Sequence, residues 1–138
     1  MAAKTTGKTI DKLALIYIRD RKVLFARTKG QELYYIPGGK RELGENDVQA
    51  LTREIKEELG SNITTGSLKF MNIFEAPAHN KPPGTMVKLS CYTGSLENEP
   101  KPTSEIDDIR FMSSADESRV PYAGILILKW LKKEGLID

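Results

Sequence analysis

The chain has 138 residues, of which 39% are apolar and 29% are charged, and its formal net charge is +2. These values are typical of a globular domain and exclude a disordered chain. There is no apolar run long enough to span a bilayer, and the small charge with no basic block argues against nucleic acid as a partner.

The length predicts a single domain over residues 1–138 with one hydrophobic core. The polar start of the chain lacks the apolar segment of a signal peptide, and the single cysteine, Cys91, excludes an internal disulfide. Cys91 lies in an apolar run and is interpreted as a small buried side chain. We therefore expect a cytoplasmic protein, and the composition leaves open whether it is a monomer or a homodimer.

The first third of the chain predicts short strands. Residues 1–9 are polar and are expected to be frayed. The apolar runs 13–18 and 23–27 flank a polar turn and predict a hairpin. Residues 33–36 (LYYI) predict a third strand, which Pro37 ends because it lacks a backbone donor.

A helix is predicted between Asn46 and Gly60. Asn46 and Gln49 have the spacing of a capping box, and Gly60 is suited to the left-handed conformation that ends many helices. Four apolar residues fall on one stripe at helical spacing and are expected to face the core: Val48, Leu51, Ile55 and Leu59.

The remaining chain predicts strands over residues 68–74, 86–92 and 109–112, separated by loops that contain proline and glycine. Pro121 suits the start of a final helix, for which the apolar residues 124–133 form the body. Strands on both sides of a central helix, with a closing helix, predict an α+β fold.

Glu54, Glu57 and Glu58 lie on one face of the predicted central helix because they are three or four residues apart. Such a like-charged cluster destabilises a helix unless something compensates it, and a hard divalent cation such as Mg²⁺ or Mn²⁺ would do so. The alternative interpretation is a solvated acidic surface.

The residues around this cluster resemble the signature of the Nudix hydrolases, G-x5-E-x7-R-E-U-x-E-E-x-G-U, where U is aliphatic. The match consists of Gly39, Glu45, Arg53, Glu54, Ile55, Glu57, Glu58 and Gly60. Ser61 departs from it, because it stands where the pattern has an aliphatic residue. The resemblance implies an α/β/α sandwich with a mixed β-sheet between helices.

The resemblance also implies roles for individual residues. Glu54, Glu57 and Glu58, with the carbonyl of Gly38, would bind Mg²⁺, or alternatively Mn²⁺. Arg53 would pair with a carboxylate and orient it, and Glu45 would support the junction between loop and helix. The general base is left open between Glu54 and a group of more distant acids: Glu97, Glu99, Glu105 and Asp108.

Several further residues are candidates for contacting a nucleotide. Arg27 and Lys40 could bind phosphate, Gly39 would let the backbone approach the metals, and Tyr34 or Tyr35, but not both, could stack on a base. His79 is the only histidine and is expected to be exposed.

Three functions are compatible with the sequence. The leading one is hydrolysis of a nucleoside triphosphate, which could be an oxidised one, to the monophosphate and pyrophosphate, as in MutT-like enzymes. The second is hydrolysis of a nucleoside diphosphate sugar such as ADP-ribose, for which Pro77 stands at a suitable distance beyond the signature. The third is a nucleotide sensor without turnover, although the sequence keeps all the acids.

Overall fold

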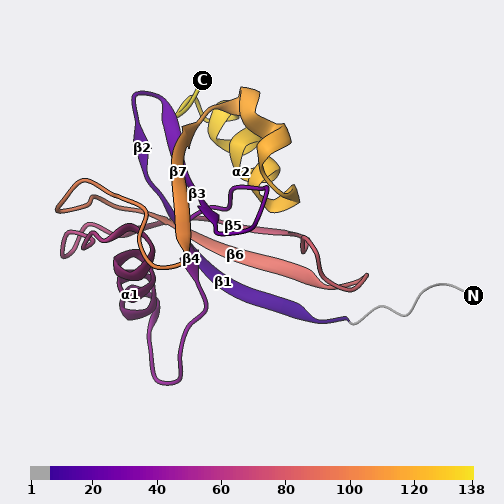
Figure 1. Cartoon of the computed structure of the whole chain (residues 1–138), viewed down its shortest axis with the longest axis horizontal. Coiled ribbons are helices and arrows are strands. Elements are labelled where there is room, and N and C mark those ends of the chain that lie inside the picture. Colours follow the sequence, from indigo (N-terminus) through magenta and orange to yellow (C-terminus); the bar gives the residue numbers. More distant parts are fainter. Residues whose placement is uncertain (1–6) are drawn as a thin grey trace, which may run out of the picture.

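The structure is a computed structural model that describes residues 7–138. The predicted fraying covers residues 1–9, of which residues 1–6 lie outside the described part. Thr9 is the first residue of the first strand, so the prediction is wrong there. Within residues 7–138 the strands form two sheets, and the helices α1 and α2 lie on opposite sides of them (Figure 1). The predicted α+β fold is therefore confirmed, although the strands are divided between two sheets.

The larger sheet has the strand order β4-β1-β6-β5. It contains β1 (Thr9–Ile16), β4 (Gly38–Gly39), β5 (Lys69–Pro77) and β6 (Met86–Thr93). β1 pairs in parallel with β6 from Thr9↔Met86 to Ile16↔Thr93, and the other two pairs are antiparallel. The predicted strands 68–74 and 86–92 are thus confirmed.

The smaller sheet has the order β2-β3-β7 and is antiparallel. It contains β2 (Ile18–Arg19), β3 (Lys22–Thr28) and β7 (Ile106–Met112). The predicted hairpin is formed by β2 and β3, with positive φ angles of 52° and 60° at its two turn residues, Asp20 and Arg21. The chain changes sheets at Tyr17, which lies between β1 and β2.

The predicted strand over residues 33–36 is wrong. Only an isolated bridge joins Tyr35 to Ala26, and the amide of Tyr34 donates instead to the carbonyl of Arg119. The segment satisfies its backbone groups on two different partners, so no continuous ladder forms. The strand pairing with β1 falls further along, at Gly38 and Gly39.

Helix α1 spans Asp47–Leu59 and has the predicted ends. The Asn46 side chain accepts from the Gln49 amide, the Gln49 side chain accepts from the Asn46 amide, and Gly60 has φ 63°. The predicted core stripe is wrong at Val48, which is 55% exposed, whereas Ala50 is buried. Periodicity defines the stripe, but it does not show that the sheet covers the helix only from Ala50 onward.

Helix α2 spans Tyr122–Lys133 and begins after Pro121, as predicted. A short 3₁₀ helix, η1 (Ser114–Arg119), precedes it and was not predicted. Its ends are fixed locally, because Ser113 and Asp116 form a capping box of their own. Such a short element has no apolar periodicity by which to find it.

The strand β1 contributes to two hydrophobic cores, one on each side of the larger sheet. Ala14 and Ile16 belong to the core that α2 covers, and Leu13 and Leu15 belong to the core that α1 covers. This alternation follows from the two-residue period of a strand. Cys91 is buried in the α2 core, as predicted, and burial raises the pKa of its thiol to about 12.

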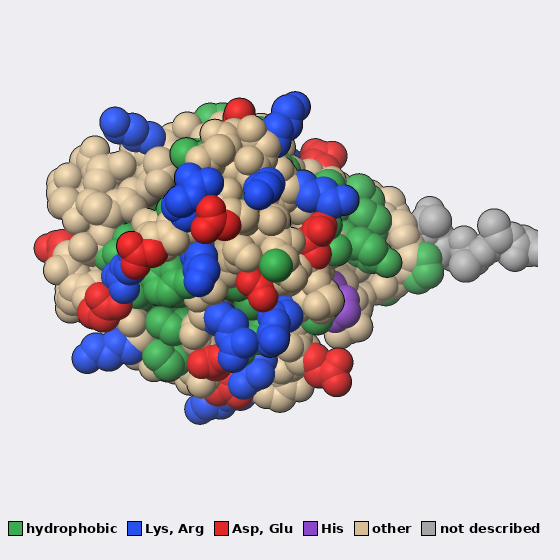
Figure 2. Space-filling model, turned by 90° about the horizontal axis from the view of Figure 1, so that it is seen from above, with side chains coloured by type: hydrophobic (Ala, Val, Ile, Leu, Met, Phe, Trp, Pro, Cys, Tyr) green, Lys and Arg blue, Asp and Glu red, His purple; other side chains and the backbone are tan. Residues whose placement is uncertain are grey.

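The face in Figure 2 carries basic and acidic side chains interspersed among apolar ones. Among residues 7–138, neither helix is long and apolar enough to cross a membrane.

The burial of α1 can be tested with a matched pair of substitutions. Ile55→Ala removes a fully buried side chain and is expected to lower the free energy of unfolding by about 2–5 kcal/mol. Val48→Ala removes an exposed one from the same helix and should change it by less than about 0.5 kcal/mol. Urea unfolding followed by circular dichroism measures both, and equal losses would contradict the observed packing.

Candidate active site

Gly38 and Gly39 bring the backbone of β4 unusually close to its neighbours. A Cβ on Gly38 would lie 2.0 Å from the carbonyl oxygen of Leu13, and Gly38 has φ 147°. A Cβ on Gly39 would lie 2.4 Å from the carboxylate carbon of Glu54. Glycine is required at both positions, at Gly38 for strand pairing and at Gly39 because the Glu54 carboxylate fills the space.

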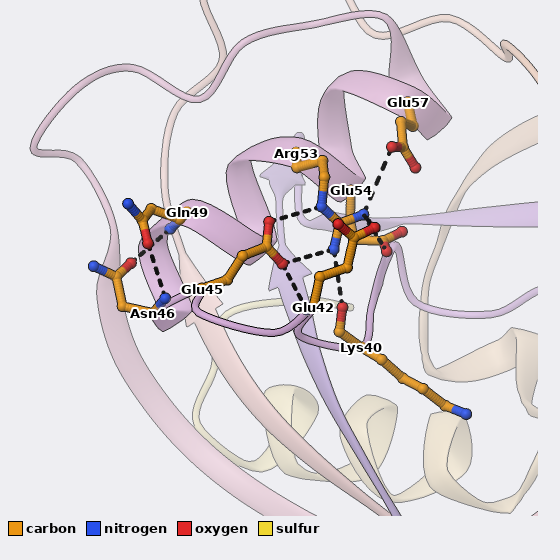
Figure 3. Close-up of polar contacts among 8 residues, drawn as sticks. All are labelled: Lys40, Glu42, Glu45, Asn46, Gln49, Arg53, Glu54 and Glu57. Atoms are coloured by element: carbon orange, nitrogen blue, oxygen red, sulfur yellow. Dashed lines mark hydrogen bonds and ion pairs between the residues drawn. The ribbon is translucent and has the colours of Figure 1, made fainter.

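Arg53 joins the loop before α1 to the acidic face of the helix (Figure 3). Its Nε and Nη2 atoms donate to the two carboxylate oxygens of Glu45 at 2.8 and 2.9 Å. Its Nη1 atom donates to Glu54 at 2.8 Å, and Nη2 also donates to the carbonyl of Lys40 at 3.0 Å. One guanidinium therefore fixes the loop, the start of the helix and Glu54 relative to each other.

Glu45 is held on both sides. Its carboxylate accepts from Arg53 and from the backbone amide of Glu42 at 2.7 Å. These hydrogen bonds favour the charged form and lower the pKa of Glu45 to about 2. The geometry agrees with the predicted supporting role at the loop–helix junction.

Glu58 lies deeper than the other acids of the face. Burial raises the pKa of its carboxyl to about 8, because the charged form loses water, and the neighbouring charges of Glu54 and Glu57 act in the same direction. The amide of Gly38 donates to Glu58 at 3.2 Å and partly opposes that shift. The side chain of Glu58 therefore links its own helix, α1, to the backbone of β4.

A hollow of about 190 Å³, called the acidic hollow below, lies beside this face of α1. Its lining combines four acids with three other residues: Glu54, Glu57, Glu58, Glu105, Thr28, Ser104 and Ile106. Glu105 comes from the loop before β7, which is far from α1 in the sequence. Spacing along the helix predicts the first three acids but not the fourth.

The loop that carries Glu105 is anchored on the C-terminal end of α1. The Thr103 amide donates to the carbonyl of Glu58 at 3.1 Å, and its hydroxyl donates to the carbonyl of Glu57 at 2.5 Å. Both carbonyls belong to the last turn, where a helix has no partners of its own. Ser104 then adopts φ 56°, and Glu105 follows in the acidic hollow.

Ser61, where the resemblance expects an aliphatic residue, is fully buried. Its hydroxyl donates to the carbonyl of Asn98 at 2.7 Å and accepts from the Asn98 amide at 3.2 Å. The departure therefore affects packing against this same loop rather than the acidic hollow, because a satisfied hydroxyl replaces an apolar contact.

The other distant acids are engaged elsewhere. Glu99 accepts two hydrogen bonds from Arg19, at 2.6 and 3.0 Å, and Asp108 accepts from the hydroxyl of Tyr34. Neither of them, nor Glu97, lines the acidic hollow. Of the four distant acids, Glu105 alone lines the acidic hollow.

A larger cleft of about 570 Å³ adjoins the acidic hollow, with Thr28, Glu58 and Ile106 lining both. Its lining includes apolar residues of β1, β6 and the start of α2. Its polar lining includes Lys12, Gln31, Asn80 and Lys81. A cleft that combines apolar walls with convergent polar groups is the usual form of a small-molecule site.

Tyr35 and His79 form an aromatic corner in this cleft, with ring centroids 6.2 Å apart. The expectation that His79 is exposed is wrong, because it is half-buried there. Its loop joins β5 to β6 and returns over the cleft, which the sequence around a lone histidine does not indicate.

The sequence-predicted substrate residues are distributed unevenly. Tyr34 is only 3% exposed and lines neither cavity, whereas Tyr35 lines the cleft. Arg27 donates to Asp107 at 3.0 Å and lies over the Tyr34 ring. The Lys40 side chain extends away from the carboxylates in Figure 3. The structure brings together Gly38, Gly39 and the three helix acids, but not Arg27 or Tyr34.

The donor set can be tested against a divalent cation. Among residues 7–138, no group of three Asp, Glu, His or Cys side chains is arranged to hold a metal ion. Arg53 binds Glu54 and lies 3.6 Å from Glu57. The chemistry nevertheless fits, because the acidic hollow offers carboxylate oxygens, and the half-buried Glu58 has no positive partner within ion-pair distance among the described residues.

The fold is an α+β sandwich. Its site consists of a glycine-containing loop and the helix that follows it, α1, whose acids lie beside a cleft. The NUDIX domain family matches residues 11–129. The chain therefore belongs to the Nudix family.

Similar proteins include a CTP pyrophosphohydrolase of Escherichia coli (strain K12), which is 43% identical over 63 residues. A provisionally named ADP-ribose pyrophosphatase of Bacillus subtilis (strain 168) is 32% identical over 65 residues. These regions cover 43% and 47% of the chain, but only 47% and 30% of the two relatives. The solution structure of the E. coli ORF135 protein has a TM-score of 0.70 and 26% identity, and the match covers 95% of this chain and 96% of that one.

Replacement of Gly38 and of Gly39 by alanine should affect different properties, the stability of the fold in the first case and Mn²⁺ binding in the second. Gly38→Ala forces a Cβ against backbone and should destabilise the fold by more than about 1 kcal/mol. Gly39→Ala meets only the movable end of Glu54, so the protein should fold and lose Mn²⁺ affinity. Thermal unfolding and Mn²⁺ binding by electron paramagnetic resonance measure these effects, and unchanged Mn²⁺ binding by Gly39→Ala would contradict the assignment.

Proposed function

We propose that the chain is a metal-dependent pyrophosphohydrolase that cleaves a phosphoric anhydride of a nucleotide by attack of water on phosphorus. The observation that carries this proposal is the continuity of the acidic hollow with the cleft through Glu58. A substrate lying in the cleft would extend its phosphates to the carboxylates. Membership of the Nudix family supports the same reaction class.

The carboxylates of Glu54, Glu57 and Glu58, with the carbonyl of Gly38, would hold Mg²⁺, or alternatively Mn²⁺. The cation would neutralise phosphate oxygens and favour ionisation of the attacking water. Arg53 is a positioning residue in this proposal, because it fixes Glu54 in one orientation and contacts neither cavity. Glu45 in turn fixes Arg53.

Glu105 is our choice for the general base. It lies in the acidic hollow with the proposed ligands, and no side-chain hydrogen bond or ion pair with residues 7–138 engages it. Glu54, the other candidate on the helix, is held by Arg53 at 2.8 Å and is needed as a ligand. A base from a separate loop can accept the proton while the helix acids remain on the metal.

The preferred substrate is a nucleoside triphosphate, which would give the monophosphate and pyrophosphate. The similarity to a CTP pyrophosphohydrolase supports this choice. ADP-ribose is the second candidate, supported by the relative named for that activity and by Pro77 in the cleft wall. A panel of triphosphates and ADP-ribose separates the two, since pyrophosphate is the product of the first and ribose 5-phosphate of the second.

Replacing a proposed ligand should remove turnover without unfolding the protein. Glu58→Gln is expected to reduce kcat at least a hundredfold, because the metal loses a charged ligand. Its stability should be kept, since a carboxyl with a pKa of about 8 is largely protonated at neutral pH and the amide is likewise neutral. Glu99→Gln, on the Arg19 pair, is the matched control and should keep full kcat. Full turnover by Glu58→Gln on every substrate of the panel would disprove the site.

The general base has its own test. Glu105→Gln should lower kcat by about 10²–10⁴-fold at saturating Mg²⁺ while KM changes little, because a base acts in the transition state. Glu97→Gln, outside the acidic hollow, should have no effect. Full kcat in Glu105→Gln would assign the base to another group.

A further inference from the structure

Lys12 is the one charged residue on a face of β1 that is otherwise apolar. Residues 10, 12, 14 and 16 of β1 point to the same side of the sheet. Ile10, Ala14 and Ile16 are buried there, and Lys12 is half-buried in the floor of the cleft. The ammonium of a lysine on such a face loses hydration, and its apolar neighbours offer neither a hydrogen bond nor an opposite charge in return.

The Lys12 ammonium forms no hydrogen bond and no ion pair with any side chain or backbone group of residues 7–138. Burial lowers the pKa of Lys12, and the positive charges of Lys40 and Lys81 lower it further. Glu58 and Glu54 oppose that shift, so they are near enough to be felt but too far to pair. A desolvated cation without a counter-ion costs stability, and an anionic ligand would relieve that cost.

The position of Lys12 selects the kind of anion. It lies in the cleft together with Glu58 and Gly38, which are two of the proposed metal ligands. Lys81, on the loop between β5 and β6, lines the same cleft. A group that reaches both the acidic hollow and this lysine pair must be extended and must carry negative charge along its length, as a phosphate chain does.

We propose that Lys12 binds a phosphate oxygen of the substrate on the cleft side of the carboxylates, and that it makes the cleft selective for a polyphosphate chain. Lys81, on the β5–β6 loop that lines the same cleft, is a second cation for this chain. The identity of this anion as the substrate's own phosphate rests on the proposed function. The contribution of Lys12 to anion binding does not, because it follows from the cleft alone.

The test measures binding of inorganic triphosphate by isothermal titration calorimetry in EDTA, where no metal contributes. Lys12→Met removes the ammonium and its charge and keeps an unbranched side chain that is one atom shorter. It should weaken triphosphate binding about ten- to hundredfold, the loss expected for a hydrogen bond to a charged group. Lys69→Met, an exposed lysine of β5 outside the cleft, is the matched control and should bind like the parent protein.

The same variant gives a second signature that a structural lysine would not. If Lys12 is kept for a ligand, Lys12→Met should raise the midpoint of thermal unfolding of the free protein by about 3 °C or more. Lys12→Arg should keep most of the triphosphate affinity. If Lys12→Met does not fold, Lys12→Gln replaces it in the titration.

Triphosphate affinity within threefold of the parent in Lys12→Met overturns the inference, whatever the unfolding midpoint. Loss of affinity together with a failure of the parent to hydrolyse any substrate of the panel supports the inference and disproves the proposed function. Hydrolysis by Lys12→Met with unchanged KM overturns the inference and supports the proposed function.

Discussion

The hydrogen bonds from Arg53 to Glu45 and Glu54 are the interactions on which the rest of the site depends. Three acids on one helical face repel one another, and a single guanidinium offsets part of that repulsion. Its planar shape allows it to bind Glu45 with two nitrogens while a third atom faces Glu54. Because Glu45 belongs to the loop and Glu54 to the helix, loop and helix cannot move independently.

The position of the site follows from the different roles of the two sides of the larger sheet. One side of β1 packs under α1, which carries the acids, and the other side forms the floor of the cleft. β4 lies at the edge next to β1, where Gly38 contacts both the strand and Glu58. The acids and the cleft are therefore adjacent because they are built on the same strand. The loop before β7 completes the arrangement from the smaller sheet.

The sequence predicts this structure best where the signal is local. The ends of α1 were predicted correctly, because Asn46, Gln49 and Gly60 act within a few residues of themselves. Features that depend on a residue distant in the sequence were not predicted. Nothing near Tyr17 indicates that the chain changes sheets there, and the choice between Tyr34 and Tyr35 depends on which side of the segment meets Asp108.

The site divides in the same way. The three helix acids follow from spacing, whereas Glu105 comes from a distant loop that Thr103 anchors on the last turn of α1. Lys12 had a signal in the sequence, because it is a charged residue within an apolar strand. That signal is obscured when the hydrophobicity of the whole strand is considered at once. Comparing the two faces of β1 separately would have found it.

The parallel pairing of β1 with β6 has a consequence for how the protein is made. Thr9 pairs with Met86, which lies 77 positions further along the chain. The first strand leaves the ribosome long before its neighbour is synthesised, and it must wait with an apolar face uncovered. The cleft floor needs both strands, so it cannot assemble before β6 is made. A chain that stalls before β6 has the three acids of α1 without this floor.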